Sequence, residues 1–240
     1  MKLFPLLLLF GLGCPALLAQ AAGGSTGEQV AVHERRAHEL LLAKRPALAA
    51  QECAAIVALD PGNIDAQGNL GVLLYFEGKY ADAEQHLRAT VEAQPGLVKI
   101  QALLGMCERN LGKMDQAKAD LAAAVPLLKE PGIQVQAGLE LVEIYTAEHD
   151  LVKAAGVIET LRQSSPTDRR VLYPAYRVYT DLANEALLDL SVAAPDSGQM
   201  HQAIAHELVR EGDTKGAIAS YRKAMAADPT VFLLGEDVAD

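Results

Sequence analysis

The chain has 240 residues, of which 50% are hydrophobic and 5% aromatic, and it contains no tryptophan. This composition supports a sizeable core and favours Ala- and Leu-rich helices over a β-sandwich. The net charge of −10 argues against a nucleic-acid partner, because proteins that bind nucleic acids gather Lys and Arg on one face.

The N-terminus has the pattern of a secretory signal peptide. Met1-Lys2 is a short basic start, residues 3–18 are mostly apolar, and Ala19-Gln20-Ala21 supplies the small-x-small sequence that signal peptidase requires. We therefore expect cleavage near Ala21, which removes residues 1–21, followed by a flexible lead-in over 22–29. The mature protein is then periplasmic or secreted, without membrane insertion.

A lipoprotein anchored through Cys14 is the alternative to cleavage at Ala21. Gly11 stands three positions before Cys14, where lipidation signals carry an aliphatic residue, so this alternative is the weaker one.

Two cysteines, Cys53 and Cys107, remain after cleavage. Export would allow a disulfide between them, and buried free thiols are the other possibility. The chain has no CxxC pair and no Cys/His spacing of the zinc-binding kind, so we expect no metal and no cofactor.

A 34-residue interval organises the rest of the chain. Leu70-Gly71, Gly78, Ala83 and Leu87 recur as Leu104-Gly105, Gly112, Ala117 and Leu121, while Ala183 and Pro195 recur as Ala217 and Pro229. This period predicts stacked helix–turn–helix units. Gly71 and Ala83 are small because two helices are expected to cross there at close range.

The interval predicts about six units over residues 30–229. The first, 30–63, is atypical, as the end of a stack must be. The others are 64–97, 98–132, 133–168, an irregular 169–197 and 198–230, followed by a C-terminal stub over 231–240. Asn63 is the expected N-cap of the second unit.

The irregular fifth unit has 29 residues between Pro166 and Pro195, and Pro174 falls within its first helix. We expect either a tight turn near residues 181–184 or one long bent helix.

These residues resemble the tetratricopeptide repeat family over nearly the whole mature chain, most clearly in units 64–97, 98–132 and 198–230. The resemblance implies an all-α, right-handed α-solenoid whose first helices line a concave face that binds extended peptides or partner helices. Gln67, Gln101 and His201 stand where the family has a large aromatic residue.

On first helices of this pattern, the positions opposite the Leu-Gly seam are predicted to line a partner-binding groove. They are Asn69, Val72, Tyr75, Phe76, Lys99, Met106, Arg109, Asn110 and Glu143, with Gln136 and Glu140 beside Glu143. Aromatic, Met and hydrogen-bonding side chains suit a peptide groove. The competing interpretation is an ordinary solvated helix face.

Relatives that clamp a chaperone's C-terminal carboxylate use five Lys, Arg and Asn positions. Only Asn69 and Lys99 match here, and Glu34 would repel a carboxylate, so we reject that partner.

The sequence therefore predicts a protein-binding scaffold or adaptor in the cell envelope and not an enzyme. The alternatives are an accessory component of an enzyme acting on an envelope polymer and a self-assembling structural protein. Glu84 and Arg88 are expected to form a surface i,i+4 pair, and Glu140 and Glu143 to be solvated.

Overall fold

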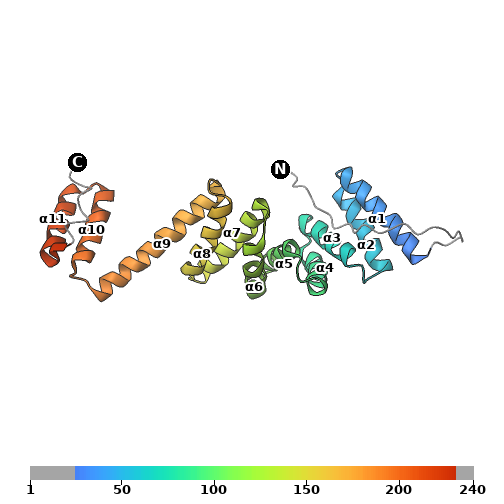
Figure 1. Ribbon diagram of the computed structural model, residues 1–240, viewed down its shortest axis with the longest axis horizontal. Coiled ribbons are helices and arrows are strands. Elements are labelled where there is room, and N and C mark those ends of the chain that lie inside the picture. Colours follow the sequence, from blue (N-terminus) through green and yellow to red (C-terminus); the bar gives the residue numbers. More distant parts are fainter. Residues whose placement is uncertain (1–24, 231–240) are drawn as a thin grey trace. The chain divides into compact units, whose positions relative to one another are not determined.

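The computed structural model describes residues 25–230, which form α-helices, one short 3-10 helix and connecting turns, with no strand in that range (Figure 1). The predicted signal peptide, the start of the lead-in and the C-terminal stub lie outside the described residues. None of the helices between residues 25 and 230 combines the length and hydrophobicity that a membrane span requires.

Ten of the α-helices described here form five hairpins, and the members of each hairpin pack against each other. The hairpins are α1 (Thr26–Leu42) with α2 (Pro46–Leu59), α3 (Ile64–Phe76) with α4 (Tyr80–Ala93), α5 (Val98–Asn110) with α6 (Met114–Ala124), α7 (Pro131–Ala147) with α8 (Leu151–Ser164), and α10 (Gly198–Glu211) with α11 (Thr214–Ala227). A 3-10 helix, Val125–Leu127, follows α6 and contains Pro126. Along the chain α2 packs on α3, α4 on α5 and α6 on α7, so the first four hairpins stack as an α-solenoid.

Two predicted boundaries are wrong. Helix α1 begins at Thr26 and not at Val30, because Ser25 and Glu28 form a capping box: the Glu28 N–H donates to Ser25 Oγ, and the Ser25 N–H donates to Glu28 Oε2 at 3.0 Å. Pro131 and Gly132, which the predicted bounds place at the end of unit 98–132, are the first residues of α7. Proline fits there because the first turn of a helix needs no N–H from it.

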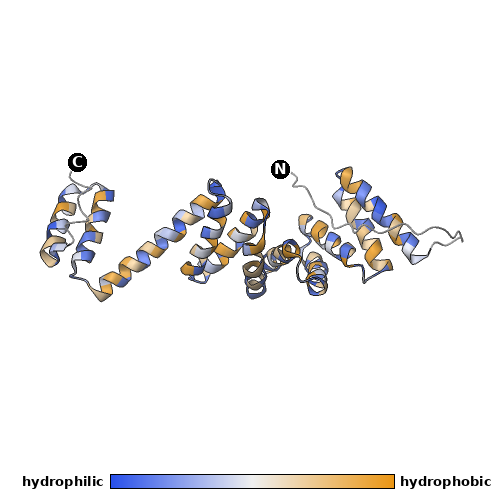
Figure 2. Cartoon of the chain, viewed as in Figure 1, coloured by the Kyte–Doolittle hydropathy of each residue, from blue (hydrophilic) through white to orange (hydrophobic). Residues whose placement is uncertain are grey.

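The fifth unit is one helix of 25 residues, α9 (Arg169–Ala193), so the tight turn near residues 181–184 is absent from it. Figure 2 shows hydrophobic and hydrophilic residues alternating along α9, as in an amphipathic helix. The chain divides into two compact units, 1–174 and 175–240, and the division falls inside α9. The sequence had predicted one solenoid of about six repeats that is irregular over 169–197.

Small residues at fixed positions let the helices of each hairpin approach closely. Gly71, Gly105 and Gly138 are each the eighth residue of their helix. A Cβ atom on Gly71 would lie 2.7 Å from Leu87 Cγ and 3.0 Å from the Leu87 backbone nitrogen. The second helices contribute alanine at their fourth residue, and these alanines are buried: Ala49, Ala83, Ala117, Ala154 and Ala217. The predicted close crossing at Gly71 and Ala83 is confirmed.

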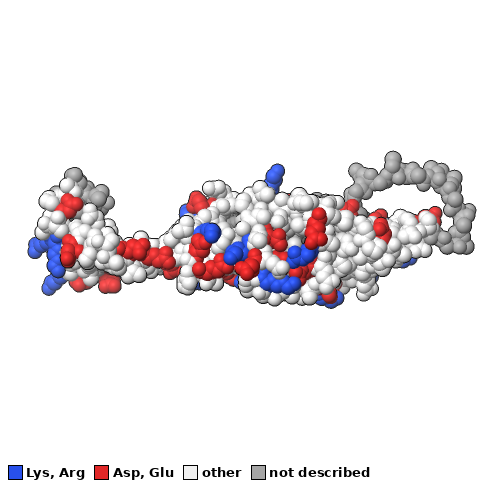
Figure 3. Space-filling model, turned by 90° about the horizontal axis from the view of Figure 1, so that it is seen from below, with Lys and Arg blue, Asp and Glu red and all other residues white. Residues whose placement is uncertain are grey.

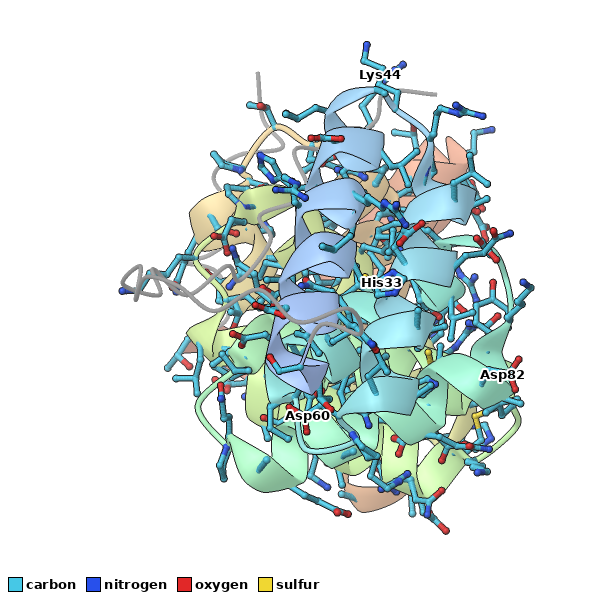
Figure 4. All side chains as sticks on the ribbon, turned by 90° about the vertical axis from the view of Figure 1, so that its right-hand side faces the viewer. His33, Lys44, Asp60 and Asp82 are labelled. Atoms are coloured by element: carbon cyan, nitrogen blue, oxygen red, sulfur yellow. The ribbon has the colours of Figure 1, made fainter. Side chains whose placement is uncertain are left out.

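Three successive hairpins carry a polar bridge near the place of the missing aromatic residue. His33 Nδ1 lies 2.6 Å from Glu52 Oε2, His86 Nδ1 lies 2.5 Å from Gln67 Oε1, and Gln101 Nε2 donates to Asp120 Oδ1 at 3.2 Å. The two residues of each bridge are 19 positions apart in the sequence, and equivalent residues of successive bridges are 34 positions apart. In Figure 4, His33 lies between α1 and α2, with Lys44 at the turn that joins these helices. Hydrogen bonds thus join the paired helices at the level where the family usually packs a ring.

Cys53 and Cys107 are both buried and free. Burial raises the pKa of the Cys53 thiol to about 11 and that of Cys107 to about 12. Both sulfurs therefore act as small apolar core groups rather than as reactive thiolates.

The close crossing can be tested with two alanine substitutions of opposite expected sign. Gly71→Ala should lower the free energy of unfolding by about 1–3 kcal/mol, because the new methyl meets the Leu87 backbone. Gly156→Ala in α8, where an added Cβ has no neighbour within 4 Å, should raise it by up to about 1 kcal/mol through helix propensity. Urea denaturation measures both. Equal effects of the two substitutions would contradict the crossing.

The turns within the hairpins provide a second test. Gly78, Gly112 and Gly212 adopt positive φ, and Lys44 and His149 take that conformation in the first and fourth hairpins, with φ of 57° and 58°. A Cβ atom disfavours positive φ. His149→Gly should therefore raise the melting temperature, whereas Gly112→Ala should lower the free energy of unfolding by about 1 kcal/mol. Nothing lies within 4 Å of a Cβ at Gly112, so the loss would come from the backbone alone. A stabilising Gly112→Ala would refute this explanation.

Candidate protein-interaction face

The first helices α3, α5 and α7 pack against one another in series and present one face. Tyr75, in the last turn of α3, connects all three helices. Its hydroxyl lies 3.7 Å from Met106 Sδ on α5 and accepts a hydrogen bond from Gln136 Nε2 on α7 at 3.2 Å. One side chain therefore contacts both neighbouring first helices.

An aromatic cluster surrounds Tyr75. The ring of Phe76 packs edge-on against it with centroids 5.3 Å apart, and Tyr80 lies at 5.7 Å. Phe76 is 62% exposed, whereas Tyr75 is half-buried. Burial, reinforced by Tyr80 and Glu140, raises the pKa of Tyr75 to about 12, so its hydroxyl stays protonated. The cluster thus presents a neutral aromatic surface with one ring open to solvent.

Charged side chains continue this face between α5 and α7. Arg109 forms ion pairs with both Glu140 and Glu143. Burial raises the pKa of Glu140, Arg109 acts against that rise, and Glu143 adds to it. Lys99 Nζ lies 2.5 Å from an oxygen of Glu130, the N-cap of α7. Each of these two cations is therefore already paired with a carboxylate.

The structure brings together most, but not all, of the predicted groove residues. Tyr75, Arg109 and Glu143 lie in the connected set just described, with Phe76 exposed beside them and Val72 half-buried. We call this set, with Gln136 and Glu140, the α3–α5–α7 face.

Three residues predicted for the groove take other positions. Asn69 and Met106 are buried, so the expectation that they line an exposed surface is wrong; Met106 contacts the Tyr75 hydroxyl from beneath it. The Asn110 side chain is exposed and donates to the Met106 carbonyl at 2.8 Å, a bond within its own helix.

Sequence reasoning missed an ionic network that joins α4, α5 and α6. Arg88 Nη2 lies 2.8 Å from Glu84 and 2.6 Å from Glu108, and Lys113 Nζ lies 2.6 Å from Glu84. Glu84 is buried and Glu108 has no exposed surface, so the expected surface pair of Glu84 with Arg88 is in fact part of a largely buried network. Figure 3 shows basic and acidic side chains interspersed over the middle of the visible side of the molecule.

The two buried carboxylates of this network differ in their acidity. Burial opposes the ionisation of Glu84, yet hydrogen bonds from Lys113 and Arg88 outweigh it and lower its pKa. For Glu108, burial and then the nearby charge of Asp120 raise the pKa to about 7, against the pull of Arg88. Glu108 is therefore a buried acid that retains its proton to near-neutral pH.

The proton on Glu108 gives a pH test. Since its pKa is raised from 4.5 to about 7, the native state binds more protons than the unfolded state between these values, and stability falls as pH rises through them. Glu108→Gln keeps a hydrogen-bond acceptor for Arg88 but cannot titrate. We expect the difference in melting temperature, variant minus wild type, to become more positive as the pH rises from about 5 to about 8. The exposed control Glu92→Gln should show no such trend, and a pH-independent difference for Glu108→Gln would contradict the assignment.

Stacked helical hairpins whose first helices share an exposed face define an α-solenoid of the protein-interaction class. Family models described as tetratricopeptide repeats match residues 40–107, 98–125 and 198–231. The chain belongs to the tetratricopeptide repeat family, whose members are scaffolds that bind other proteins.

Solved structures of MamA proteins share the fold. A crystal structure of the MamA protein has a TM-score of 0.52 at 15% identity and covers 89% of this chain and 100% of its own. MamA from Desulfovibrio magneticus RS-1, from residue 41 to its end, has a TM-score of 0.51 at 14% identity and covers 86% of this chain and 98% of its own. A comparison with curated protein sequences gives no match.

Proposed function

We propose that this protein is an adaptor of the cell envelope that binds a peptide or a partner helix on the α3–α5–α7 face. One observation carries the proposal: Tyr75, Arg109 and their partners connect three first helices into a continuous surface that keeps Phe76 exposed. A surface held by its own contacts loses little conformational entropy when a partner binds, which favours affinity.

Export is the second part of the proposal, and the N-terminal sequence supports it. The basic start, the apolar run and Ala19-Gln20-Ala21 together match a cleavable signal peptide. Cleavage after Ala21 would make Ser25, the N-cap of α1, the fourth residue of the mature chain, so every described helix would be retained.

The carboxylates of the face favour binding over catalysis. Arg109 contacts both Glu140 and Glu143, which holds the two acids as partners of a cation. A general acid or base instead needs a carboxyl that is free to exchange its proton with a substrate.

Site-specific photo-crosslinking in intact cells tests the docking face. We expect a photoreactive residue in place of Phe76 to give a discrete adduct with another protein, because this side chain is the exposed ring of the proposed contact. Met114, a similarly exposed apolar residue at the start of α6, provides the control position. An absence of adducts at position 76, or the same adducts at both positions, would refute docking on this face.

A further inference from the structure

We propose that the partner docks through a basic segment, in which an Arg or Lys side chain pairs with the Glu143 carboxylate and apolar neighbours cover the exposed Phe76 ring. This inference rests on the proposed function, since it names the chemistry of the partner for the same α3–α5–α7 face.

The balance of charge on the face is negative. Glu140 and Glu143 supply two carboxylates and Arg109 one cation, so the sum over the face is −1 when all are ionised, and the neighbouring Lys99–Glu130 pair adds no net charge. The whole chain carries −10. Long-range attraction therefore brings cationic segments toward this protein and keeps anionic ones away.

The ion pairs within the face also favour a positively charged partner. Lys99 is held by Glu130, and Arg109 by Glu140 and Glu143. An acidic peptide or a terminal carboxylate would have to displace one of these pairs and would then lie beside the displaced carboxylate. A cation would share Glu143 with Arg109, but the two acids around Arg109 exceed its single charge and the Glu143 side chain is 67% exposed.

The aromatic part of the face suits the same side chain. Phe76 exposes a large ring next to Tyr75, and Tyr75 lies close enough to Glu140 to feel its charge. Arg and Lys can place their cationic group over a ring and cover it with their methylene stem. A basic residue with apolar neighbours therefore satisfies the exposed ring and the surplus carboxylate together.

Fluorescence anisotropy with three labelled peptides of about twelve residues tests this inference. One peptide repeats Leu, Arg and Ala, and the other two replace every Arg by Gln or by Glu. The mature full-length protein should bind the Arg peptide at least about 10-fold more tightly than the Gln peptide, and the Glu peptide should not bind. The affinity should fall as NaCl is raised, since salt screens exposed charges.

Matched variants locate the contact. Glu143→Gln and Phe76→Ala should each weaken binding of the Arg peptide by about 5-fold or more; both side chains are exposed, so the fold should be retained. Glu92→Gln makes the same charge change on an exposed position of α4 and should leave the affinity unchanged.

Three results would overturn the inference: no binding of the Arg peptide, equal binding of the Gln or Glu peptide, or the same loss from Glu92→Gln as from Glu143→Gln. The last would mean attraction to the general negative charge of the protein. If protein adducts still form at position 76, only the chemistry of the partner is wrong and the adaptor function stands. If the crosslinking and the peptide binding both fail, the adaptor function and the basic partner are both refuted.

Discussion

The close approach of paired helices, at a glycine on one and a leucine on the other, is the constraint on which the structure depends. Gly71 faces Leu87, Gly105 faces Leu121 and Gly138 faces Leu161, each with no room for a further methyl group. Ala205, at the eighth position of α10, is buried in the same way. Because the helices can come this close, each hairpin is a compact layer, and layers of similar thickness can stack.

The candidate interaction face follows from that spacing. Helices α3, α5 and α7 lie near enough for Tyr75 to reach Met106 and Gln136, and for Arg109 to reach two carboxylates of α7. These contacts fix the face before any partner arrives, and they also decide its charge: the cations are paired within the face, and the surplus is negative. The geometry of packing and the preference for a basic partner thus have one origin.

Much of the fold could be predicted because the small residues recur every 34 positions along the chain, and that period alone implies hairpins. Burial could not be predicted for Asn69 and Met106, since it depends on how neighbouring helices are rotated. The bridges of His33, Gln67 and Gln101 repeat at 34 residues, but their partners, 19 positions away, become evident only in three dimensions. The burial of Glu108 likewise reflects tertiary contacts rather than local pattern, whereas the local pattern of the fifth unit left a tight turn and one long helix as equal alternatives.

A double-mutant cycle at Gly138 and Leu161 tests the central claim most directly, because the three nearest neighbours of an added Cβ at Gly138 are all side-chain atoms of Leu161. We predict that Gly138→Ala lowers the free energy of unfolding of the wild-type protein. In the Leu161→Ala background, where the side chain next to the new methyl is removed, the same substitution should cause no further loss. The coupling free energy should be about 1–2 kcal/mol, measured by urea denaturation. Additive effects of the two substitutions would contradict the account.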